Sequence, residues 1–231
     1  MDLFEFPLTY LYFWGSFIAL ITTFLVYILK PNLRKEILRA GLYVAFWGVI
    51  FEYFFFKDYW TPELILTFGE FGGLEDLMFG FAAGGIGAVV FSIFSEHKYE
   101  RVGKRHYELP ILMALVQLSA FLLLNVKLGV NSILASTVAL ILSSLYIVLQ
   151  RPDLLTNALI TGISFGFLLA FAEWFLLTLT DSNYLSEYYL LHNSVPVLFE
   201  GFVLTEFLWG FSFGATLGPS YEFVWGIKEK K

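Results

Sequence analysis

Seven long apolar stretches run through the chain, and they constrain its fold more than any other feature. A helix of about 20 mostly apolar residues spans the hydrocarbon core of a bilayer, which is roughly 30 Å thick. Apolar residues make up 58% of the chain and charged residues only 15%, whereas soluble domains carry about 25% charged residues. Strands of a transmembrane barrel would give short alternating segments, and the sequence has no such pattern. The sequence therefore predicts an all-α integral membrane protein with seven transmembrane helices. The predicted spans are residues 8–29, 37–57, 74–95, 109–126, 129–149, 155–179 and 198–224.

Lysine and arginine are distributed unevenly between the segments that join these spans. Of the 14 such residues, all but Lys57 and Lys127 lie after spans 1, 3, 5 or 7. Short loops rich in Lys and Arg stay on the cytoplasmic side, so we expect the N-terminus outside and the C-terminus in the cytoplasm. The acidic start of the sequence lacks the basic region of a secretory signal, so its first apolar stretch is expected to remain as a span. We expect a multi-pass protein of the cell membrane.

The chain contains an internal repeat. Residues 30–55 align without gaps onto 151–176, and residues 75–85 align onto 205–215. Chance similarity between apolar helices would not place Pro, Gly and Glu at matched positions. A single linking helix restores the starting orientation, so the pattern predicts two parallel three-helix repeats in a 3+1+3 arrangement. The predicted segments are a first repeat (1–95), a basic inner loop with the linking helix (96–126) and a second repeat (127–231). The matched pairs include Pro31 and Pro152, Gly41 and Gly162, Glu52 and Glu173, Asp76 and Glu206, Gly80 and Gly210, and Gly84 and Gly214.

Acidic side chains occur inside several spans or at their outer ends. We expect all intramembrane acids to lie in the outer half of the membrane. An ionisable group in a span costs several kcal/mol and is by default a candidate functional residue. Burial in a low dielectric favours the neutral form of a carboxyl, and close pairs share protons. An acid at a helix N-terminus also interacts favourably with the helix dipole, which is the structural alternative for Glu75, Asp76 and Glu200. The candidate catalytic acids are Glu52, Glu75, Asp76, Glu173 and Glu206.

Aromatic residues make up 20% of the chain, with 27 Phe. Membrane-interface belts account for some of them, and an aromatic groove that stabilises a cation is the functional alternative. The Gly-xxx-Gly spacing at Gly80 and Gly84, and again at Gly210 and Gly214, predicts close helix contact. Helix packing is the simpler role of each aromatic. The candidate substrate-binding residues are Tyr53, Phe79, Phe81, Trp174, Trp209 and Phe211.

Several classes of site are not expected. The chain has no Cys and only three scattered His residues, which give no metal-ligand spacing. No glycine-rich dinucleotide fingerprint follows a strand. The net charge of −6 argues against nucleic-acid binding. We expect neither a metal nor a cofactor.

Each third helix of a repeat opens with acidic residues. The first copy has Gly73-Leu74-Glu75-Asp76 followed by LMFGF, and the second has Val203-Leu204-Thr205-Glu206 followed by FLWGF. Together with two three-span repeats joined by one helix, this resembles the integral-membrane lycopene β-cyclases, whose repeats carry a P-x-E-E signature. The likeness extends over about residues 8–220. Here Gly73 and Val203 replace the prolines, and Thr205 stands where the first acid of the second copy is expected.

The resemblance implies an enzyme that closes the acyclic ends of lycopene into β-ionone rings, without net redox change and without a cofactor. It maps the acids of the family onto Glu75, Asp76 and Glu206. A neutral carboxylic acid delivers a proton to the terminal C=C bond, and a nearby carboxylate removes another proton. Glu206 and Asp76 are the leading candidates for the acid and the base, and Glu52 and Glu173 are expected to hold or share the proton. The expected partners are the lipid membrane and a carotenoid, lycopene or a related isoprenoid, within it.

Two other functions fit the same sequence. Sugar transporters of the SWEET type also use parallel 3+1+3 repeats, although the acids here crowd the outer half and polar mid-depth residues are sparse. A cyclase-like protein that binds a carotenoid without converting it is the other alternative, and Thr205 and the replaced prolines keep it open.

Overall fold

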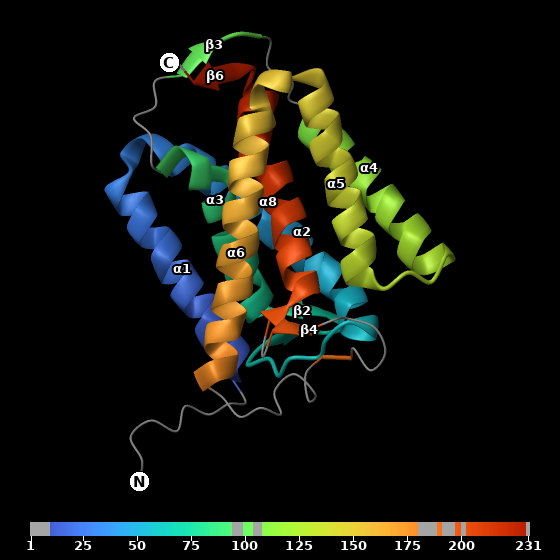
Figure 1. Ribbon diagram of the computed structural model, residues 1–231. Coiled ribbons are helices and arrows are strands. Elements are labelled where there is room, and N and C mark those ends of the chain that lie inside the picture. Colours follow the sequence, from blue (N-terminus) through green and yellow to red (C-terminus); the bar gives the residue numbers. More distant parts are fainter. Residues whose placement is uncertain are drawn as a thin grey trace. The chain divides into compact units, whose positions relative to one another are not determined.

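The computed structural model describes residues 10–93, 99–103, 108–179, 189–190, 197–199 and 202–229, and most of them lie in helices (Figure 1). Six helical segments in this part of the chain are long and apolar enough to cross a membrane. The protein is therefore a multi-pass membrane protein, as predicted. These six segments are Leu11–Leu29, Pro31–Asp58, Leu74–Ile93, Leu109–Lys127, Ser132–Gln150 and Pro152–Phe175.

The seventh predicted span contains helix α8 (Leu204–Trp225), which is not among these six. It carries Glu206, Ser212, Thr216 and Glu222, and half of its residues are buried. A helix enclosed by protein does not need an apolar surface all round, since its polar groups find protein partners. For example, the Thr216 hydroxyl lies within hydrogen-bond distance of the carbonyl oxygens of Leu140 (2.7 Å) and Ser212 (2.9 Å).

The same element order occurs twice along the chain. Helix α1 (Leu11–Leu29), the 3-10 turn η2 (Pro31–Leu33) and helix α2 (Arg34–Asp58) form the first set. Helix α5 (Ser132–Gln150), the turn η4 (Pro152–Leu154) and helix α6 (Leu155–Leu179) form the second. Every element of the second set begins and ends 121 residues after its counterpart. Proline suits the first position of both turns because no intrahelical N–H bond is needed there.

A two-stranded antiparallel hairpin precedes the next helix of each set, which the sequence analysis did not predict. Strands β1 (Thr67–Phe68) and β2 (Phe71–Gly73) precede helix α3 (Leu74–Ile93). Strands β4 (Val197–Phe199) and β5 (Phe202–Val203) precede α8. Gly69 adopts a positive φ of 77° in the first hairpin turn, a conformation that glycine reaches without steric cost.

A further helix lies between the two sets, as expected for a linking helix. Helix α4 (Leu109–Leu122) continues into the π-helical turn η3 (Leu123–Lys127). Strand β3 (Tyr99–Arg101) pairs with strand β6 (Ile227–Glu229). The Asn131 side chain accepts a hydrogen bond from the Ile133 N–H and caps the start of α5.

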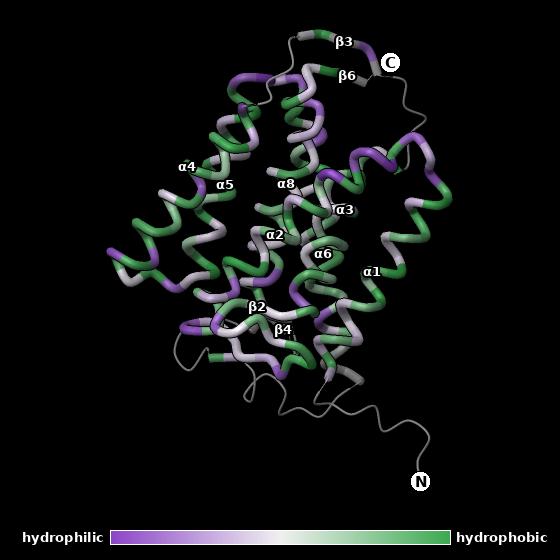
Figure 2. The backbone as a smooth tube through the Cα atoms, turned by 180° about the vertical axis from the view of Figure 1, so that it is seen from behind, coloured by the Kyte–Doolittle hydropathy of each residue, from purple (hydrophilic) through white to green (hydrophobic). Residues whose placement is uncertain are grey.

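Large apolar side chains cover much of the helix surface. Figure 2 shows hydrophobic residues along the lengths of α1, α4 and α5, with hydrophilic residues at their connections. Leu149 is 77% exposed, Leu29 73% and Ile111 67%. Exposed apolar surface on this scale is unfavourable in water and is what lipid-facing helices present.

The chain divides into two compact units, the first of residues 1–86 and 170–204 and the second of residues 87–169 and 205–231. Each unit combines segments of both predicted repeats, so the division into repeats stays a prediction about duplication of the sequence. Glycines pack helices closely in both units, as the Gly-xxx-Gly pattern predicts. A Cβ atom at Gly84 would lie 2.6 Å from the Ala40 carbonyl oxygen, and one at Gly214 2.6 Å from that of Thr161. The equivalent contacts are Gly41–Phe81 and Gly162–Phe211, Gly80–Ala45 and Gly210–Gly166, and Gly84–Ala40 and Gly214–Thr161.

Candidate functional site

Three aromatic side chains each donate a hydrogen bond to a different carboxylate in the first compact unit. Two of the donors are tyrosine hydroxyls and the third is an indole N–H. Aromatic donors of this kind combine an apolar body with one polar group that seeks a partner when buried. The pairs are Tyr12 Oη with Asp76 Oδ1 (2.6 Å), Trp60 Nε1 with Glu52 Oε2 (3.1 Å) and Tyr189 Oη with Glu173 Oε1 (2.6 Å).

The three aromatic rings meet at Trp60. The Tyr12 ring lies edge-on to it with 4.6 Å between centroids, and the Tyr189 ring lies 6.1 Å from it. The backbones of Trp60 and Tyr189 also form an antiparallel bridge. Glu52 and Glu173, which occupy equivalent positions of the sequence repeat, are thereby linked through Trp60 and Tyr189. We call this set the aromatic–carboxylate cluster; it comprises Tyr12, Glu52, Trp60, Asp76, Glu173 and Tyr189.

Local helix chemistry positions Asp76. It lies in the first turn of α3, and its Oδ2 accepts the Gly73 N–H at 2.5 Å. A side chain at the third helical position that reaches back to this N–H is one half of a capping box. The structural alternative given for Asp76 therefore holds for one oxygen, while the other binds Tyr12. A proline at position 73 would have no N–H to donate to this carboxylate.

Glu75 is the most enclosed of the candidate acids, with 0% of its surface exposed. Its Oε1 accepts the Ile65 N–H at 2.6 Å and so holds the segment before β1 against the start of α3. Its Oε2 is buried and has no hydrogen-bond partner among the residues that the structure describes. A buried carboxyl oxygen without a partner is costly when the group is ionised.

The second copy of the acidic motif lies in the second compact unit and differs from the first. Thr205 and Glu206 occupy the first turn of α8, where Glu75 and Asp76 stand in α3. Thr205 is 4% exposed and Glu206 is half-buried. Trp209, one turn further on, stacks on Phe213 with 5.1 Å between centroids. Its indole Nε1 is buried, and the described residues provide no hydrogen-bond partner for it.

The other predicted substrate-binding residues lie in different surroundings. Phe79 contacts the cluster, with its ring centroid 6.2 Å from that of Tyr12. Tyr53 lies beneath the Lys57 ammonium, 3.3 Å from its ring centroid. Trp174 is 39% exposed and contacts Phe171. Phe211 packs over Gly162 in the second unit, and Phe81 packs over Gly41 and lines an apolar groove in the first unit.

Three members of the cluster were not among the predicted site residues. Tyr12, Trp60 and Tyr189 lie at the start of the first span or in segments outside the spans, where aromatic residues are ordinarily explained as interface belts. The repeat gave no indication of Tyr12, because Ile133 stands at its equivalent position. Glu200, His97, His106 and His192 lie outside the described residues.

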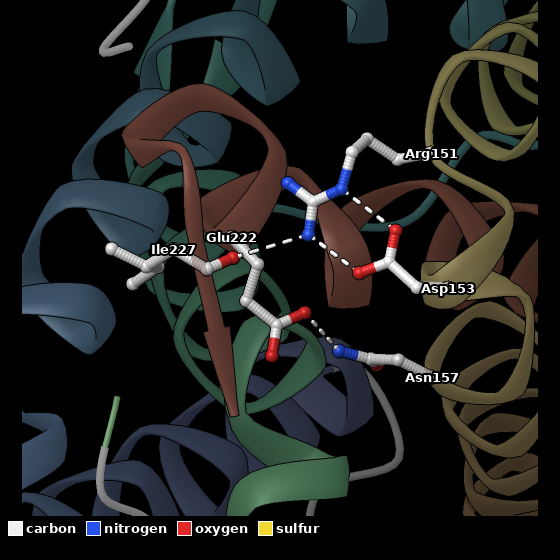
Figure 3. Close-up of polar contacts among 5 residues, drawn as sticks. All are labelled: Arg151, Asp153, Asn157, Glu222 and Ile227. Carbon is white, nitrogen blue, oxygen red and sulfur yellow. Dashed lines mark hydrogen bonds and ion pairs between the residues drawn. The ribbon is translucent and has the colours of Figure 1, made fainter. Parts of the chain in front are cut away.

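A polar cluster near the C-terminal end of α8 corrects the expectation that all intramembrane acids lie in the outer half. Glu222 lies within the seventh predicted span, is 4% exposed and accepts a hydrogen bond from Asn157 Nδ2 at 2.7 Å. Thr161 donates in turn to Asn157 Oδ1 at 2.9 Å. Figure 3 shows the Asn157 amide directed at the Glu222 carboxylate. A neutral amide thus donates to a buried carboxylate at this end, which hydropathy alone does not reveal.

Arg151 lies beside this polar cluster. Its guanidinium forms a two-pronged ion pair with Asp153, both contacts at 2.7 Å, and donates to the Ile227 carbonyl at 3.3 Å (Figure 3). The hydrogen bonds with Asp153 raise the pKa of Arg151 further, and the negative charges of Asp153 and Glu222 add to the effect. This arrangement ties strand β6 to the start of α6 and has a structural role.

Comparison with protein families, with curated proteins and with solved structures found no match to this chain. The resemblance to membrane cyclases therefore depends on the motif and the repeat. Within the described part of the chain, no group of three or more His, Asp or Glu residues is placed to hold a metal ion.

Proposed function

We propose that this chain is a carotenoid cyclase of the cell membrane that converts the acyclic ends of lycopene into β-ionone rings. The proposal includes seven spans in a 3+1+3 arrangement, with the N-terminus outside. The 121-residue recurrence of helices and turns supports the arrangement. The lysine and arginine distribution supports the orientation.

The aromatic–carboxylate cluster is the observation that carries the proposal. Cyclisation passes through a carbocation, which aromatic faces stabilise and which water would trap. Asp76 is 2% exposed, and Glu75 beside it is fully enclosed. The Tyr12 hydroxyl donates a hydrogen bond to Asp76, and the Tyr12 ring lies 4.6 Å from the ring of Trp60, which donates to Glu52. Enclosed acids next to aromatic faces are the combination that this chemistry needs.

The hydrogen bonding assigns different roles to the two neighbouring acids. Glu75 keeps one oxygen without a partner in the described part of the chain, so we assign it as the acid that protonates the terminal C=C bond. Asp76 accepts hydrogen bonds on both oxygens, the pattern of an ionised carboxylate. We assign it as the group that stabilises the cation and takes the proton lost after ring closure.

The proton balance closes without a redox partner. One proton passes from Glu75 to the polyene, a neighbouring double bond attacks the cation to form the ring, and one proton leaves to Asp76. A proton then returns from Asp76 to Glu75, and Tyr12, which donates to Asp76 at 2.6 Å, is placed to assist this return. The product is an isomer of the substrate end.

The test is pigment production in cells that accumulate lycopene. Wild-type chain is expected to yield ring-bearing carotenoid. Glu75→Gln and Asp76→Asn are each expected to reduce it about 100-fold or more, the scale of general acid–base catalysis. Glu206→Gln in the same cells measures the contribution of the second copy. Glu36→Gln is the matched control, because Glu36 is also a buried glutamate (4% exposed) but lies outside the cluster.

Three outcomes discriminate between the functions. Ring-bearing product that depends on Glu75 and Asp76 supports the cyclase. Unchanged lycopene that copurifies with the protein indicates a carotenoid binder and contradicts the proposal. The absence of any effect on pigment, with properly inserted protein, also contradicts it and favours a carrier of another solute.

A further inference from the structure

An apolar groove lies on the first compact unit, away from the candidate acids. Its volume is about 480 Å³, and it is formed by the second half of α1, the start of α2 and Phe81 of α3. Thr23 and Ile37 line the groove and have no exposed surface. Ile21, Phe24 and Leu38 also line it and are 39–59% exposed. The volume lies within the range of about 300–1,000 Å³ that is typical of ligand pockets. None of the five candidate acids lines it.

One end of the groove is basic. Tyr27 lines the groove, and the guanidinium of Arg34 lies 5.1 Å from the centroid of its ring. Arg34 Nε donates to the Tyr27 carbonyl at 2.8 Å, and Nη2 donates to that of Ile28 at 3.2 Å. Ile37 and Leu38, which also line the groove, follow Arg34 by three and four residues on α2 and so share its helix face. The segment 30–39 holds four basic residues and one acid, Glu36.

Arg34 has no basic counterpart in the second repeat. Leu155 stands at the equivalent position of the second repeat, and the helices around it have the same bounds as those around Arg34. The two hydrogen bonds described use two of the five N–H donors of Arg34. The remaining donors suit a phosphate, which guanidinium groups bind with two parallel hydrogen bonds.

We propose that this groove binds an anionic phospholipid, with an acyl chain along Ile21, Phe24 and Leu38 and the phosphate on Arg34. The apolar wall and the basic end match the two parts of such a lipid. Basic pockets between helices on the cytoplasmic side are known to bind anionic headgroups, and the distribution of Lys and Arg predicts that side here. The site does not depend on the cyclase proposal, since it shares no residue with the assigned acids.

Lipid binding to the purified full-length chain in detergent tests this proposal by native mass spectrometry. The probes are phosphatidylglycerol and phosphatidylcholine with identical acyl chains. Phosphatidylglycerol is expected to bind about fivefold more tightly, since one basic residue near a headgroup contributes about 1 kcal/mol. Arg34→Gln is expected to remove this preference, and Arg34→Lys to keep most of it.

Matched variants distinguish specific binding in this groove from general association of lipid with the protein. Arg39→Gln removes one charge from the same segment, but it lies about 140° around the helix from Arg34 and is expected to leave the preference unchanged. Phe24→Ala is expected to weaken binding of both lipids about threefold or more, from the apolar contact it loses. Phe171→Ala is its control, because both side chains are 59% exposed on lipid-facing helices.

Other results overturn the proposal. Equal binding of the two lipids by wild-type chain would do so, as would a preference that survives Arg34→Gln. Displacement of phosphatidylglycerol by lycopene, with loss of that competition in Phe24→Ala, would show that the groove receives the polyene. The two outcomes that concern lipid preference do not bear on the roles of Glu75 and Asp76, which pigment production tests separately.

Discussion

The helix pairs α2–α3 and α6–α8 pack in the same way but carry different polar groups. Equivalent glycines approach equivalent backbone atoms, at 2.6 Å for both Gly84 and Gly214. At the start of the second helix of each pair, however, the buried Glu75 of α3 is replaced by Thr205 in α8. The packing is maintained because a larger side chain would collide with a helix backbone. Helix packing does not require an acid at this position, so we expect the acid–base chemistry to reside in the first copy.

The opposite ends of the two pairs show a second difference. Glu36 of α2 corresponds to Asn157 of α6, and Ser92 of α3 corresponds to Glu222 of α8. All four side chains are between 3% and 5% exposed. Each pair therefore keeps one buried carboxylate, but on a different helix. The position of the buried acid at this end is therefore not fixed by the repeat.

The largest expected effect comes from converting the first acidic motif into the second. Glu75→Thr is expected to lower ring formation in lycopene-accumulating cells about 100-fold or more, because it removes the assigned general acid. Thr205→Val, a substitution at the equivalent position of the second copy, is expected to leave ring formation within about twofold, since it removes no acid or base. Carotenoid chromatography of the two strains measures both. Equal losses from the two variants would show that the copies are not chemically different.

The next largest effect concerns the close packing at glycine that the two helix pairs share. Gly84→Ala and Gly214→Ala are each expected to destabilise the protein by about 1–3 kcal/mol, the usual cost of overpacking. Gly48→Ala is the control, because a Cβ there meets its nearest atoms at an ordinary 3.9 Å. Thermal unfolding in detergent measures the three variants. A neutral effect at either Gly84 or Gly214 would contradict equivalent packing of the two pairs.

The helices and their repeat could be predicted from the sequence, because an apolar helix in lipid satisfies its own backbone and needs no distant partner. The predicted span 155–179 has the bounds of α6, and 74–95 ends two residues beyond α3. Pro31 and Pro152 mark the same turn in both copies. The hairpins before α3 and α8 were missed, since strands of two or three residues are too short to show an alternating pattern.

The site could be predicted only in part. Asp76, Glu52 and Glu173 were identified from acidity within apolar sequence. The donor to Asp76, Tyr12, lies 64 residues away along the chain, whereas Trp60 and Tyr189 follow Glu52 and Glu173 by 8 and 16 residues but lie outside the predicted spans. The candidate substrate-binding residues included Tyr53 and Trp174, each of which directly follows an acid. Successive residues on a helix point about 100° apart, so these two rings contact other neighbours.

A third test concerns the buried Glu222 carboxylate of the second pair and its donor Asn157. Asn157→Leu is expected to destabilise the protein by about 1–3 kcal/mol, because Glu222 loses the amide that donates to it and stays buried. In Asn157→Leu/Glu222→Leu, the buried charge is removed as well, and we expect about half of the loss to be recovered. Thermal unfolding in detergent measures both. No recovery in the double variant would mean that the Glu222 carboxylate is not what Asn157 stabilises.

The smallest expected effect lies at the turns that precede α2 and α6. Arg151 and Asp153 of the second turn correspond to Lys30 and Asn32 of the first. The Arg151–Asp153 side chains are 20% and 28% exposed, so Asp153→Asn is expected to cost only about 0.3–1 kcal/mol, as for surface ion pairs. Arg151→Gln is expected to cost more, because it also removes the hydrogen bond to the Ile227 carbonyl. In the first turn, Asn32→Asp would give Lys30 an acid at the same spacing. It is expected to stabilise the protein by less than about 0.5 kcal/mol, since a lysine cannot form the two-pronged pair.

The stabilities of these variants are measured by thermal unfolding at low salt and at about 1 M salt, where screening shortens the range of charge interactions to roughly 3 Å. The cost of Asp153→Asn should fall at high salt, while the extra cost of Arg151→Gln should persist, because a carbonyl hydrogen bond is screened much less than an ion pair.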